Sequence, residues 1–397
     1  MPPIKAWLRA DDRKGIRNTV QIVYLVECAH HVATKIAAAF SDDDVNVIGF
    51  GGCYPNAYAH KMLCQLCTHP NVGAVLLVSL GCEGFDRRAL LDVIRASGRP
   101  VELIGIQATG GTRKTIATGQ EWVRCALTDL AALPRVDMAV EELIIGTVCG
   151  GSDAMSGITA NPAVGDCFDR LVAAGATCIF EETGELIGCE HIMAARAATP
   201  ALGEELVRSV EKAAAYYAVL GHGSFAPGNA DGGLTTLEEK SMGAYAKSGS
   251  SRINGMLQPG DVPRGRGLHL LDVVPDGEVR FGFPNINDNA EIAELIACGS
   301  HVIVFTTGRG SVVGSAISPV IKVCANPETY RRMTDDMDVN AGRIVEGAAA
   351  IADVGAEIFG LVVAVAAGQK TCSEQLGHRE FVLTYKAFAP PSPACAC

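Results

Sequence analysis

Short apolar runs alternate with helix-periodic segments along this sequence, and no other feature restricts the possible folds as strongly. The first four apolar runs cover residues 20–26, 45–50, 73–80 and 101–107. Segments with helical periodicity lie between these runs, at residues 31–40, 57–67 and 87–97. This order and spacing predict parallel βα units, and nearly continuous apolar runs are typical of sheets that helices cover on both faces. We therefore expect an α/β fold.

A change in the alternation near residues 133–140 indicates a domain boundary. A long helix is expected at residues 114–133, before the alternation resumes. Further strands are expected at residues 142–148, 177–182, 268–274 and 301–305, and helices at 162–174, 204–220 and 236–247. Residues 340–367 have a helical pattern in two pieces, broken near Val354 and Gly355. We expect two α/β domains, at residues 1–138 and 139–388, followed by a Pro-rich tail at 389–397.

Charge and apolar content exclude several classes of protein. The 397 residues include 33 Lys and Arg against 44 Asp and Glu, which gives a net charge of −11. Without a basic block, binding to nucleic acid is not expected. No apolar run reaches the roughly 18 residues of a membrane span, and the N-terminus lacks the apolar core of a signal peptide. With 15 Cys, an odd number, we expect a cytoplasmic protein with reduced thiols.

Many of the 44 glycines are clustered where an apolar run ends. Pairs occur at residues 51–52, 110–111, 150–151 and 232–233, and a Gly-Arg-Gly turn lies at 308–310. Glycine lets the backbone approach a ligand closely, and open α/β sheets bind ligands at the carboxyl ends of their strands. The spacing fits neither a dinucleotide fingerprint nor a phosphate-binding P-loop. The glycine turns therefore predict a ligand site at the strand ends that is not a nucleotide site.

Cysteines stand at four of the expected strand ends: Cys28, Cys53, Cys82 and Cys149. If the sheets share one active edge, these thiols converge there, and Glu83 adds an oxygen ligand. Thiolate sulfur suits iron or zinc, so the pattern is that of a metal site. In the alternative interpretation, some of these cysteines are only small residues in tight turns.

A glycine pair precedes a capped helix in the C-terminal half of the sequence. Thr235 or Thr236 can cap this helix, and Glu238 or Glu239 can complete a capping box. Backbone N–H groups at such a helix end can hold a carboxylate or sulfonate, and Lys240 lies one turn further on, in a place suited to a base. The alternative is an ordinary capped helix with Lys240 in a surface ion pair.

Arg309 lies between two glycines, directly after an expected strand. An arginine held between two stretches of close backbone is suited to binding a carboxylate through two hydrogen bonds. The alternative is an exposed arginine in a flexible turn. Arg17, beside the first expected strand, is a second arginine of interest.

Several segments, in order along nearly the whole chain, resemble the altronate/galactarate dehydratase family. They are GIRN at 15–18, HPNVGAVLLVSLGCE at 69–83, GGTRKT at 110–115, CGGSDAMSGITANP at 149–162, PGNADGGLTTLEEKSMG at 227–243, FTTGRG at 305–310 and DVNAG at 338–342. The segments at 149–162 and 227–243 are long and specific. The chain is therefore identified as a member of this family.

The resemblance implies a metal-dependent lyase. Members of the family use iron or another divalent metal, and they eliminate water from sugar acids to give 2-keto-3-deoxy acids. In this chemistry a 2-hydroxy carboxylate loses its C2 proton and expels a β-substituent. A base, a metal ion and an arginine supply what such a step needs. The expected cofactor is a divalent metal, with Fe²⁺ favoured and an iron–sulfur cluster left open.

The resemblance also implies roles for individual residues. The expected metal ligands are Cys28, Cys53, Cys82, Glu83 and Cys149. The expected catalytic residues are Asp153, Glu239 and Lys240, with Lys240 as the base at C2. The expected substrate-binding residues are Arg17, Asn18, Ser152, Thr235, Thr236 and Arg309, with Arg309 holding the carboxylate.

Three features of the resemblance favour sulfite over water as the leaving group. The chain begins almost at GIRN, whereas full-length dehydratases carry a small N-terminal β-rich domain of the SAF type. This organisation resembles the large subunits of sulfolactate sulfo-lyases, in which the small domain is a separate chain. GRGSVVG at 308–314 resembles the same enzymes, and Gly49 stands where the sugar-acid enzymes have a His.

We therefore expect an oligomer with a small SAF-type subunit, acting on a small hydroxy carboxylate. The favoured reaction releases sulfite and pyruvate from sulfolactate. One alternative is a sugar-acid dehydratase of the altronate or galactarate type. The other is a non-catalytic subunit that binds sugar acids.

Overall fold

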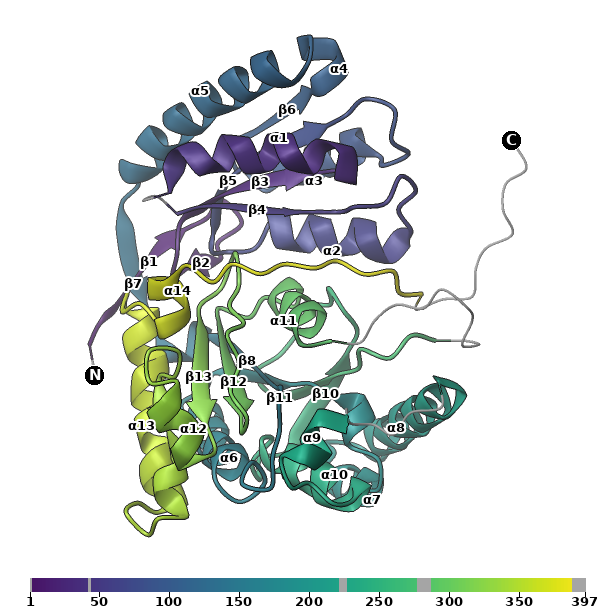
Figure 1. Cartoon of the computed structure of the whole chain (residues 1–397), viewed down its shortest axis with the longest axis vertical. Coiled ribbons are helices and arrows are strands. Elements are labelled where there is room, and N and C mark those ends of the chain that lie inside the picture. Colours follow the sequence, from purple (N-terminus) through teal and green to yellow (C-terminus); the bar gives the residue numbers. More distant parts are fainter. Residues whose placement is uncertain (1, 42–43, 221–226, 277–286, 388–397) are drawn as a thin grey trace.

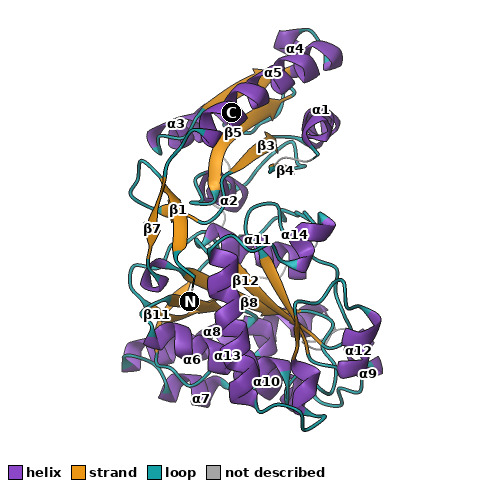
Figure 2. Ribbon diagram, turned by 90° about the vertical axis from the view of Figure 1, so that its left-hand side faces the viewer, coloured by secondary structure: helices purple, strands orange, loops and turns teal. Residues whose placement is uncertain are grey.

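The structure is a computed structural model that describes residues 2–41, 44–220, 227–276 and 287–387. Two parallel β-sheets form an upper and a lower layer, each with helices on both faces (Figure 1). Figure 2 shows the same two layers from the side. The prediction of an α/β fold built from parallel βα units is confirmed. The predicted Pro-rich tail lies outside the described residues.

The N-terminal sheet has the strand order β4-β3-β5-β6, and its strand pairs are parallel. Its strands are β3 (Thr19–Tyr24), β4 (Val45–Gly49), β5 (Val72–Ser79) and β6 (Val101–Gly105). Its helices are α1 (Glu27–Ala37), η1 (Ala38–Phe40), α2 (Ala57–Cys67), α3 (Arg87–Ala96), α4 (Ile106–Thr109) and α5 (Thr112–Ala131). Helices α1 and α5 pack on one face, and α2 and α3 on the other.

The C-terminal sheet has the strand order β10-β11-β9-β8-β12-β13-β14, and its strand pairs are also parallel. Its strands are β8 (Ile144–Cys149), β9 (Thr177–Phe180), β10 (Ile253–Leu257), β11 (Gly267–Leu271), β12 (Val302–Thr307), β13 (Val320–Cys324) and β14 (Val339–Asn340). Strands β8 and β12 lie in the middle of the sheet and are almost fully buried, which explains their unbroken apolar sequences.

The helices around this sheet vary widely in length. They are η2 (Val140–Glu142), α6 (Ala160–Ala173), η3 (Thr183–Glu185), α7 (Glu190–Ala195), α8 (Pro200–Leu220), α9 (Pro227–Asp231), α10 (Leu237–Ala246), α11 (Asp288–Ala297), α12 (Pro327–Arg332), η4 (Ala341–Ile344), α13 (Ile351–Ala366) and α14 (Cys372–Leu376). Helices α6 and α13 pack together, whereas α11 contacts β8 and β12 together with α2 of the upper layer.

A small antiparallel sheet joins the start of the chain to the segment between the two layers. Its strands are β1 (Ile4–Leu8), β2 (Lys14–Gly15) and β7 (Arg135–Met138), in the order β2-β1-β7. The connection between the layers is thus pinned by hydrogen bonds to the N-terminal strand. The sequence indicated a change near residues 133–140, but it gave no sign of this pairing.

One hydrophobic cluster joins the two layers. It contains Leu63 of α2, Leu295 of α11 and Phe305 of β12, all of them buried. Helices α2 and α11 therefore lie between the two sheets, as Figure 1 shows. Burial of this shared apolar surface fixes the layers against each other.

Residues 378–386 form an extended segment, here called the C-terminal strap, which crosses between the layers (yellow in Figure 1). Arg379 Nη1 donates to Val45 O at 3.0 Å, and Asn56 Nδ2 donates to Lys386 O at 2.7 Å. The strap is thus fastened to β4 at one end and to the start of α2 at the other.

Helix α13 runs without interruption through Val354 and Gly355, so the predicted break there is wrong. A Cβ at Gly355 would clash with the Asp166 carboxylate of α6. This glycine therefore marks close helix packing and does not end a helix. The two helical pieces are instead η4 and α13, which are separated by residues 345–350.

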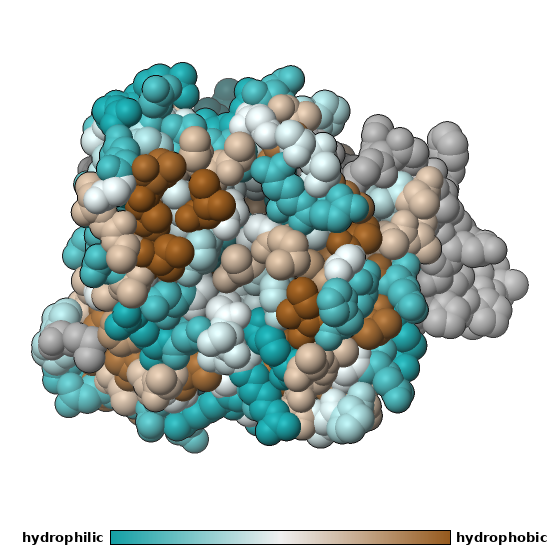
Figure 3. Space-filling model, turned by 90° about the horizontal axis from the view of Figure 1, so that it is seen from below, coloured by the Kyte–Doolittle hydropathy of each residue, from teal (hydrophilic) through white to brown (hydrophobic). Residues whose placement is uncertain are grey.

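The surface of the lower layer mixes apolar and hydrophilic areas. Seen from below, apolar residues form several separate patches between hydrophilic ones (Figure 3). Apolar surface of this kind is normal for a globular protein. Within the described ranges, no helix is both long enough and apolar enough to cross a membrane.

Candidate active site

The glycine turns after β8 and β12 meet at the middle of the C-terminal sheet. Strand β8 pairs with β9 on one side and with β12 on the other, so the strand order reverses beside β8. Open α/β sheets bind ligands outside the carboxyl ends of the strands at such a reversal. Gly308 N and Arg309 N both donate to Gly151 O, at 3.1 and 2.8 Å. Two of the glycine turns singled out in the sequence are therefore in direct contact here.

Cys149, Glu182 and Glu185 form a compact group of three possible metal ligands beside these turns. One ligand atom from each residue lies within 4.8 Å of the other two. Cys149 Sγ lies 3.5 Å from Glu185 Oε2, and Cys149 N donates to Glu182 Oε1 at 2.6 Å. A sulfur with carboxylate oxygens suits a divalent transition metal. The donor set is therefore compatible with a metal ion.

Lys240 reaches this group from α10. Its Nζ donates to Ser152 Oγ at 3.0 Å and to Cys149 Sγ at 3.3 Å, and it contacts Glu185 Oε2. Burial alone would lower the pKa of Lys240, but the charges of Cys149 and Glu185 raise that pKa above its usual value. Lys240 is thus a charged hydrogen-bond donor in this arrangement. A base must first lose its proton, so the role of Lys240 as the C2 base stays a prediction.

Glu182 is held by an unusual backbone conformation and by a second lysine. Its φ is 85°, in the left-handed region that residues other than glycine seldom adopt. Lys247 Nζ contacts Glu182 Oε2, and both side chains are buried. Strained backbone persists only where the surrounding structure holds it, and it clusters at functional sites. The conformation of Glu182 therefore independently marks this place in the fold.

Asp153 fixes the loop that follows β8. Its Oδ1 accepts hydrogen bonds from two backbone N–H groups of the next turn, at 3.0 and 3.1 Å, and its Oδ2 accepts one from Asn326 Nδ2 at 3.0 Å. A Cβ at Gly308 would clash with this carboxylate, so the second glycine turn requires glycine there. The contacts place Ser152 beside Lys240. They do not support a direct catalytic role for Asp153, which stays a prediction.

Arg309 lies at the edge of the site and is partly exposed. Its Nη1 contacts Gly228 O and lies 3.9 Å from Asp231 Oδ2. A Cβ at Gly232 would lie 3.2 Å from Arg309 Cδ, so this glycine leaves room for the arginine. The Gly-Arg-Gly turn is thus seated against the glycine-rich segment before α10.

The cap of α10 is made as the sequence predicts. Thr236 Oγ1 accepts a hydrogen bond from Glu239 N at 3.2 Å, while the Glu239 carboxylate accepts from Thr235 N and Oγ1 at 2.9 and 2.7 Å. The hydrogen bonds from Thr235 lower the pKa of Glu239. Thr235, Thr236 and Glu239 therefore serve the helix end, and only Lys240 of this segment contacts the Cys149 group.

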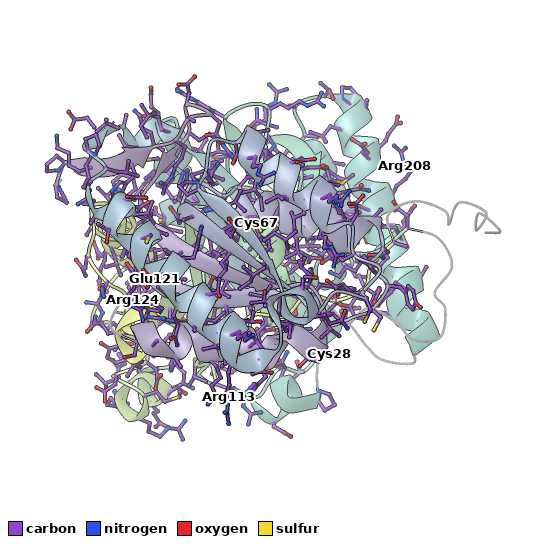
Figure 4. All side chains as sticks on the ribbon, turned by 90° about the horizontal axis from the view of Figure 1, so that it is seen from above. Cys28, Cys67, Arg113, Glu121, Arg124 and Arg208 are labelled. Atoms are coloured by element: carbon purple, nitrogen blue, oxygen red, sulfur yellow. The ribbon has the colours of Figure 1, made fainter. Side chains whose placement is uncertain are left out.

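The other predicted thiol ligands belong to the upper layer. Cys28, Cys53 and Cys82 follow β3, β4 and β5, and all three are exposed. Figure 4 labels Cys28 at the start of α1, and Cys67, which is buried at the end of α2. Gly84 N donates to Cys53 O at 2.8 Å, so the loops after β4 and β5 lie side by side.

The structure does not bring these three thiols and Glu83 together with Cys149 in one group of ligands, and their role as metal ligands stays a prediction. Across the part of the chain that the structure describes, Cys149 with Glu182 and Glu185 is the only group of three such ligands. Strands of one sheet share a carboxyl edge, but Cys149 ends a strand of the other sheet. Glu83 instead accepts hydrogen bonds from Gly81 N at 2.8 Å and from Ser79.

Arg17 and Asn18 precede β3, at the edge of the sheet opposite to the strand ends. Arg17 forms a two-pronged ion pair with Glu374 at 2.7 and 3.0 Å. Asn18 accepts a hydrogen bond from Arg9 at 2.8 Å and donates one to Leu130 O at 3.2 Å. The structure therefore places both residues away from Cys149, in contacts that tie the chain together. Their predicted substrate contacts gain no support.

Glu182, Glu185 and Lys247 were not singled out from the sequence. The signal was present, because β9 ends in Glu181-Glu182-Thr183-Gly184-Glu185, a strand followed by a polar, glycine-containing turn. Turns of this kind were considered as metal sites only where they contain a cysteine. Lys247 had no such signal, since a lysine that directly follows a helix, as this one follows α10, is usually exposed.

Two family models cover most of the chain. Residues 140–389 match the C-terminal domain of D-galactarate/altronate dehydratases, and residues 6–131 match the second domain of D-galactarate dehydratase/altronate hydrolase. The chain belongs to the D-galactarate/altronate dehydratase family. The membership identified from the sequence segments is thus confirmed.

Curated relatives of this family member are enzymes. Subunit beta of (2R)-sulfolactate sulfo-lyase from Chromohalobacter salexigens is 34% identical over 387 residues, which are 95% of both chains. Altronate dehydratase from Bacillus subtilis is 31% identical over 96% of this chain and 77% of its own. Galactarate dehydratase (L-threo-forming) from Escherichia coli is 35% identical over 78% of this chain and 59% of its own. The family member described here is a carbon–oxygen or carbon–sulfur lyase.

Proposed function

We propose that this protein eliminates sulfite from sulfolactate to give pyruvate, with a metal ion bound by Cys149, Glu182 and Glu185. The observation that carries the proposal is the contact of Lys240 with this ligand group, at the reversal of the strand order. A charged lysine, a thiol and two carboxylates in one buried place form a site for acid–base and metal chemistry together. The sulfo-lyase relative, which matches over 95% of both chains, supports the choice of leaving group.

A single metal ion suits this ligand group better than a cluster. Iron–sulfur clusters are held mainly by several cysteines, and this group offers one sulfur with two carboxylates. We propose Fe²⁺, because mixed sulfur and oxygen ligands suit a borderline divalent ion. Such an ion, when bound, stabilises the negative charge that develops on the substrate as its C2 proton leaves.

Arg309 would bind the substrate carboxylate. It extends from a turn that is fixed to the Cys149 loop by two backbone hydrogen bonds. A guanidinium can donate two parallel hydrogen bonds to a carboxylate, which orients it as well as binding it. Ser152 lies three residues after Cys149, its Oγ is 3.0 Å from Lys240 Nζ, and it would contact the same substrate.

Lys240 would remove the C2 proton. It would first have to release its own proton, and a metal ion held by Cys149 and Glu185 would favour that release, because it would offset the negative charges that raise the pKa of Lys240. The neutral amine then takes the proton from C2, and the electron pair of that C–H bond forms the C2–C3 double bond. The C3–S bond breaks and its electrons leave with sulfite. The enol that remains takes up a proton at C3 and releases its hydroxyl proton to become pyruvate, so that the overall reaction gives pyruvate, sulfite and one proton.

A second chain would complete the enzyme. The sulfo-lyase relative is named as a subunit beta, so that enzyme has at least one further subunit. We propose a small SAF-type subunit that covers the site of this chain. Excluding water would strengthen the electrostatic interactions at the charged intermediate.

Dehydration of a sugar acid is the second candidate. The altronate and galactarate dehydratase relatives, at 29–35% identity, favour it. The chemistry at C2 would be the same, with hydroxide leaving from C3 in place of sulfite. The leaving group therefore separates the two candidates, and product identity decides between them.

The test is an anaerobic assay of the protein with Fe²⁺, with and without a SAF-type subunit. Sulfolactate, altronate and galactarate would be supplied separately, and sulfite, pyruvate and 2-keto-3-deoxy acids measured. Sulfite and pyruvate in equal amounts are expected from sulfolactate. A 2-keto-3-deoxy acid from altronate or galactarate, with no sulfite from sulfolactate, would establish the second candidate instead. Cys125→Ser, at an exposed thiol of α5, is the matched control for Cys149→Ser.

A further inference from the structure

A cavity of about 280 Å³ lies at the edge of the N-terminal sheet where its strands begin. It is lined by the end of β1 and the turn after it, the start of β5, the end of α3 and the last residues of α5. Figure 2 shows β1 and β7 below α3 at this side of the molecule. Small-molecule sites commonly have volumes of roughly 300–1,000 Å³. The cavity is therefore large enough for a small ligand.

Two buried arginines from different segments line this cavity. Arg9 follows β1 and is 6% exposed, and Arg99 precedes β6 and is 4% exposed. Arg9 Nε donates to Pro70 O at 2.7 Å. Arg99 donates to His69 O and to Val72 O, at 3.1 Å each. Both guanidinium groups are thus held by the same short loop that leads into β5.

The hydrogen bonds to the protein leave donors on both guanidinium groups. Arg9 also donates to Asn18 Oδ1 at 2.8 Å and to Arg17 O at 3.1 Å. Arg99 also donates to Asp11 Oδ2 at 3.3 Å. Each guanidinium has five N–H groups, and three of them have partners within the described residues. Two N–H groups on each arginine are therefore left for a ligand.

Positive charge exceeds negative charge around these arginines. Asp11 pairs with Arg13 at 2.7 Å as well as with Arg99, and Arg9 has no ion pair within the described ranges. Burial and the charge of Arg99 lower the pKa of Arg9 to about 9, so Arg9 is still charged at neutral pH. A buried charge without a partner costs free energy. A bound anion would supply the missing negative charge.

The rest of the lining is mainly apolar, with Leu8, Pro100, Leu130 and Leu133 among its residues. Leu8 and Leu133 are 49% and 42% exposed, which is high for leucine. Helices α3 and α5 end at the cavity, and helix C-termini disfavour anions. A carboxylate therefore belongs at the arginines, and an apolar chain belongs against the leucines. Asp129, an exposed acid of the lining, disfavours a second negative charge on the ligand.

We propose that Arg9 and Arg99 bind the carboxylate of a small organic acid that has one negative charge and an apolar chain. A guanidinium can donate two parallel hydrogen bonds to a carboxylate. The ligand would lie against the end of α5, which leads into β7 and thus into the connection between the layers. Cys149 ends a strand of the other sheet, so this site is separate from the proposed active site, and the inference does not depend on the proposed reaction.

The probe is hexanoate, titrated into the full chain by isothermal titration calorimetry, with hexanamide as its neutral counterpart. One hexanoate is expected to bind per chain. Hexanamide should bind roughly 10- to 150-fold more weakly, because it lacks the charge that strengthens the hydrogen bonds. Arg9→Lys keeps the charge but loses the planar donor, and should weaken hexanoate binding at least about tenfold.

A second variant leaves both arginines in place, in case Arg9→Lys does not fold. Leu133→Glu adds a negative charge to the lining at an exposed position, and should also weaken hexanoate binding at least about tenfold. Val93→Glu is the matched control, because Val93 of α3 is 40% exposed and lies outside the lining. Hexanoate should raise the melting temperature of wild type and Val93→Glu more than that of Leu133→Glu, because a ligand stabilises only the state that binds it.

Four outcomes would overturn the proposal. They are no saturable binding of hexanoate, equal binding of hexanoate and hexanamide, equal binding of hexanoate to wild type and Leu133→Glu, and loss of binding in Arg309→Lys. The last result would place the ligand at the proposed active site. Failure of the sulfolactate assay would instead bear on the proposed reaction and leave hexanoate binding unchanged.

Discussion

The carboxyl edges of the two parallel sheets look alike in sequence and differ in the structure. In the N-terminal sheet, three neighbouring strands are each followed by a cysteine, in a loop after β4 and β5 and at the start of α1 after β3, and all three thiols are exposed. In the C-terminal sheet, Cys149 stands at the same kind of strand end, yet it is only 4% exposed. The same local pattern has therefore produced an open edge in one layer and a buried, charged centre in the other.

The difference comes from elements that lie far away in the sequence. Glu182 and Glu185 follow β9, and Lys240 comes from α10, so three separate segments enclose Cys149. The loop of Cys53 is joined to the loop after β5 by a backbone hydrogen bond from Gly84 N to Cys53 O. A cysteine at a strand end is thus a candidate ligand only where other elements bring charge and burial to it.

The largest effect is expected at the buried ion pair of the enclosed edge. Lys247→Met leaves the Glu182 carboxylate buried without its partner, and should lower the free energy of unfolding by about 3–5 kcal/mol. Arg124→Met on α5 breaks an exposed pair with Glu121 (both labelled in Figure 4) and should cost less than about 1 kcal/mol. Denaturation of metal-free protein measures both. Equal losses of unfolding free energy in the two variants would show that the buried ion pair contributes no more to stability than the exposed pair does.

The second prediction compares one thiol from each edge. Cys149→Ser should lose its bound metal and at least about 100-fold in activity, because removal of a ligand should cost at least as much as loss of an outer-shell partner. Cys53→Ser should keep stoichiometric metal and activity within about twofold. Metal content by mass spectrometry and the sulfolactate assay are the measurements. Loss of metal in Cys53→Ser would make the open edge part of the metal site.

The third prediction compares arginines in glycine turns of the two sheets. Arg309→Lys keeps the charge but not the planar two-pronged donor, so kcat/KM should fall roughly 10- to 150-fold. Arg113 follows Gly110-Gly111 at the upper layer and is exposed (labelled in Figure 4), so Arg113→Lys should change little. An Arg309→Lys enzyme within about twofold of wild type would show that Arg309 only supports the turn.

The smallest effect concerns the opposite edge of the C-terminal sheet, where His301 precedes β12. His301 Nδ1 accepts a hydrogen bond from Ile144 N at 3.0 Å, and Nε2 donates to Lys14 O at 2.9 Å, which requires the neutral ring. Burial is the main reason why the pKa of His301 is lowered to about 4.

An unfolded histidine has a pKa of about 6.5, so between roughly pH 6.5 and 4 the unfolded chain binds a proton that the folded chain does not. The free energy of unfolding should therefore fall as pH falls, by about 1.4 kcal/mol per pH unit from this residue. The stability that the neutral His301 ring contributes is fully present above pH 6.5 and is lost as the pH falls toward 4. His301→Gln should flatten the dependence, whereas His191→Gln, at an exposed site, should not. Parallel pH profiles for wild type and His301→Gln would contradict the assignment.

Local sequence predicted the elements well where a segment's own pattern decides its structure. Helix α2 was predicted at the residues where it occurs, because its apolar spacing and the polar residues around it suffice. Gly355 was misread, since a glycine inside a helix can mark a break or a close neighbour, and only the position of Asp166 decides. Helix α11 was missed, because its acids interrupt the apolar pattern that a buried helix usually shows.

The candidate site was also predicted only in part. The missing part depends on contacts between segments that lie far apart in the sequence. Lys240, Ser152 and Cys149 were among the predicted residues, and the structure brings them together. Arg17 was also a candidate, but its partner Glu374 is 357 positions away, and no local pattern reports such a pair. The predicted boundary near residues 133–140 already separates Cys149 from the other three thiols, but whether two sheets share one active edge depends on the whole fold and not on local sequence.

The C-terminal strap has a consequence for the order of events while the protein is being made. Lys386 is the counter-charge of Glu294 and also acts on Glu181, which is synthesised about 200 residues earlier. At ribosomal speeds of about 5–20 residues per second, Glu181 waits roughly 10–40 s for this lysine, and Glu294 about half as long. During that interval they remain hydrated, because a carboxylate without a partner resists burial. The ion pair between Lys386 and Glu294 can therefore form only after the strap has left the ribosome, which makes it a late contact between the two layers.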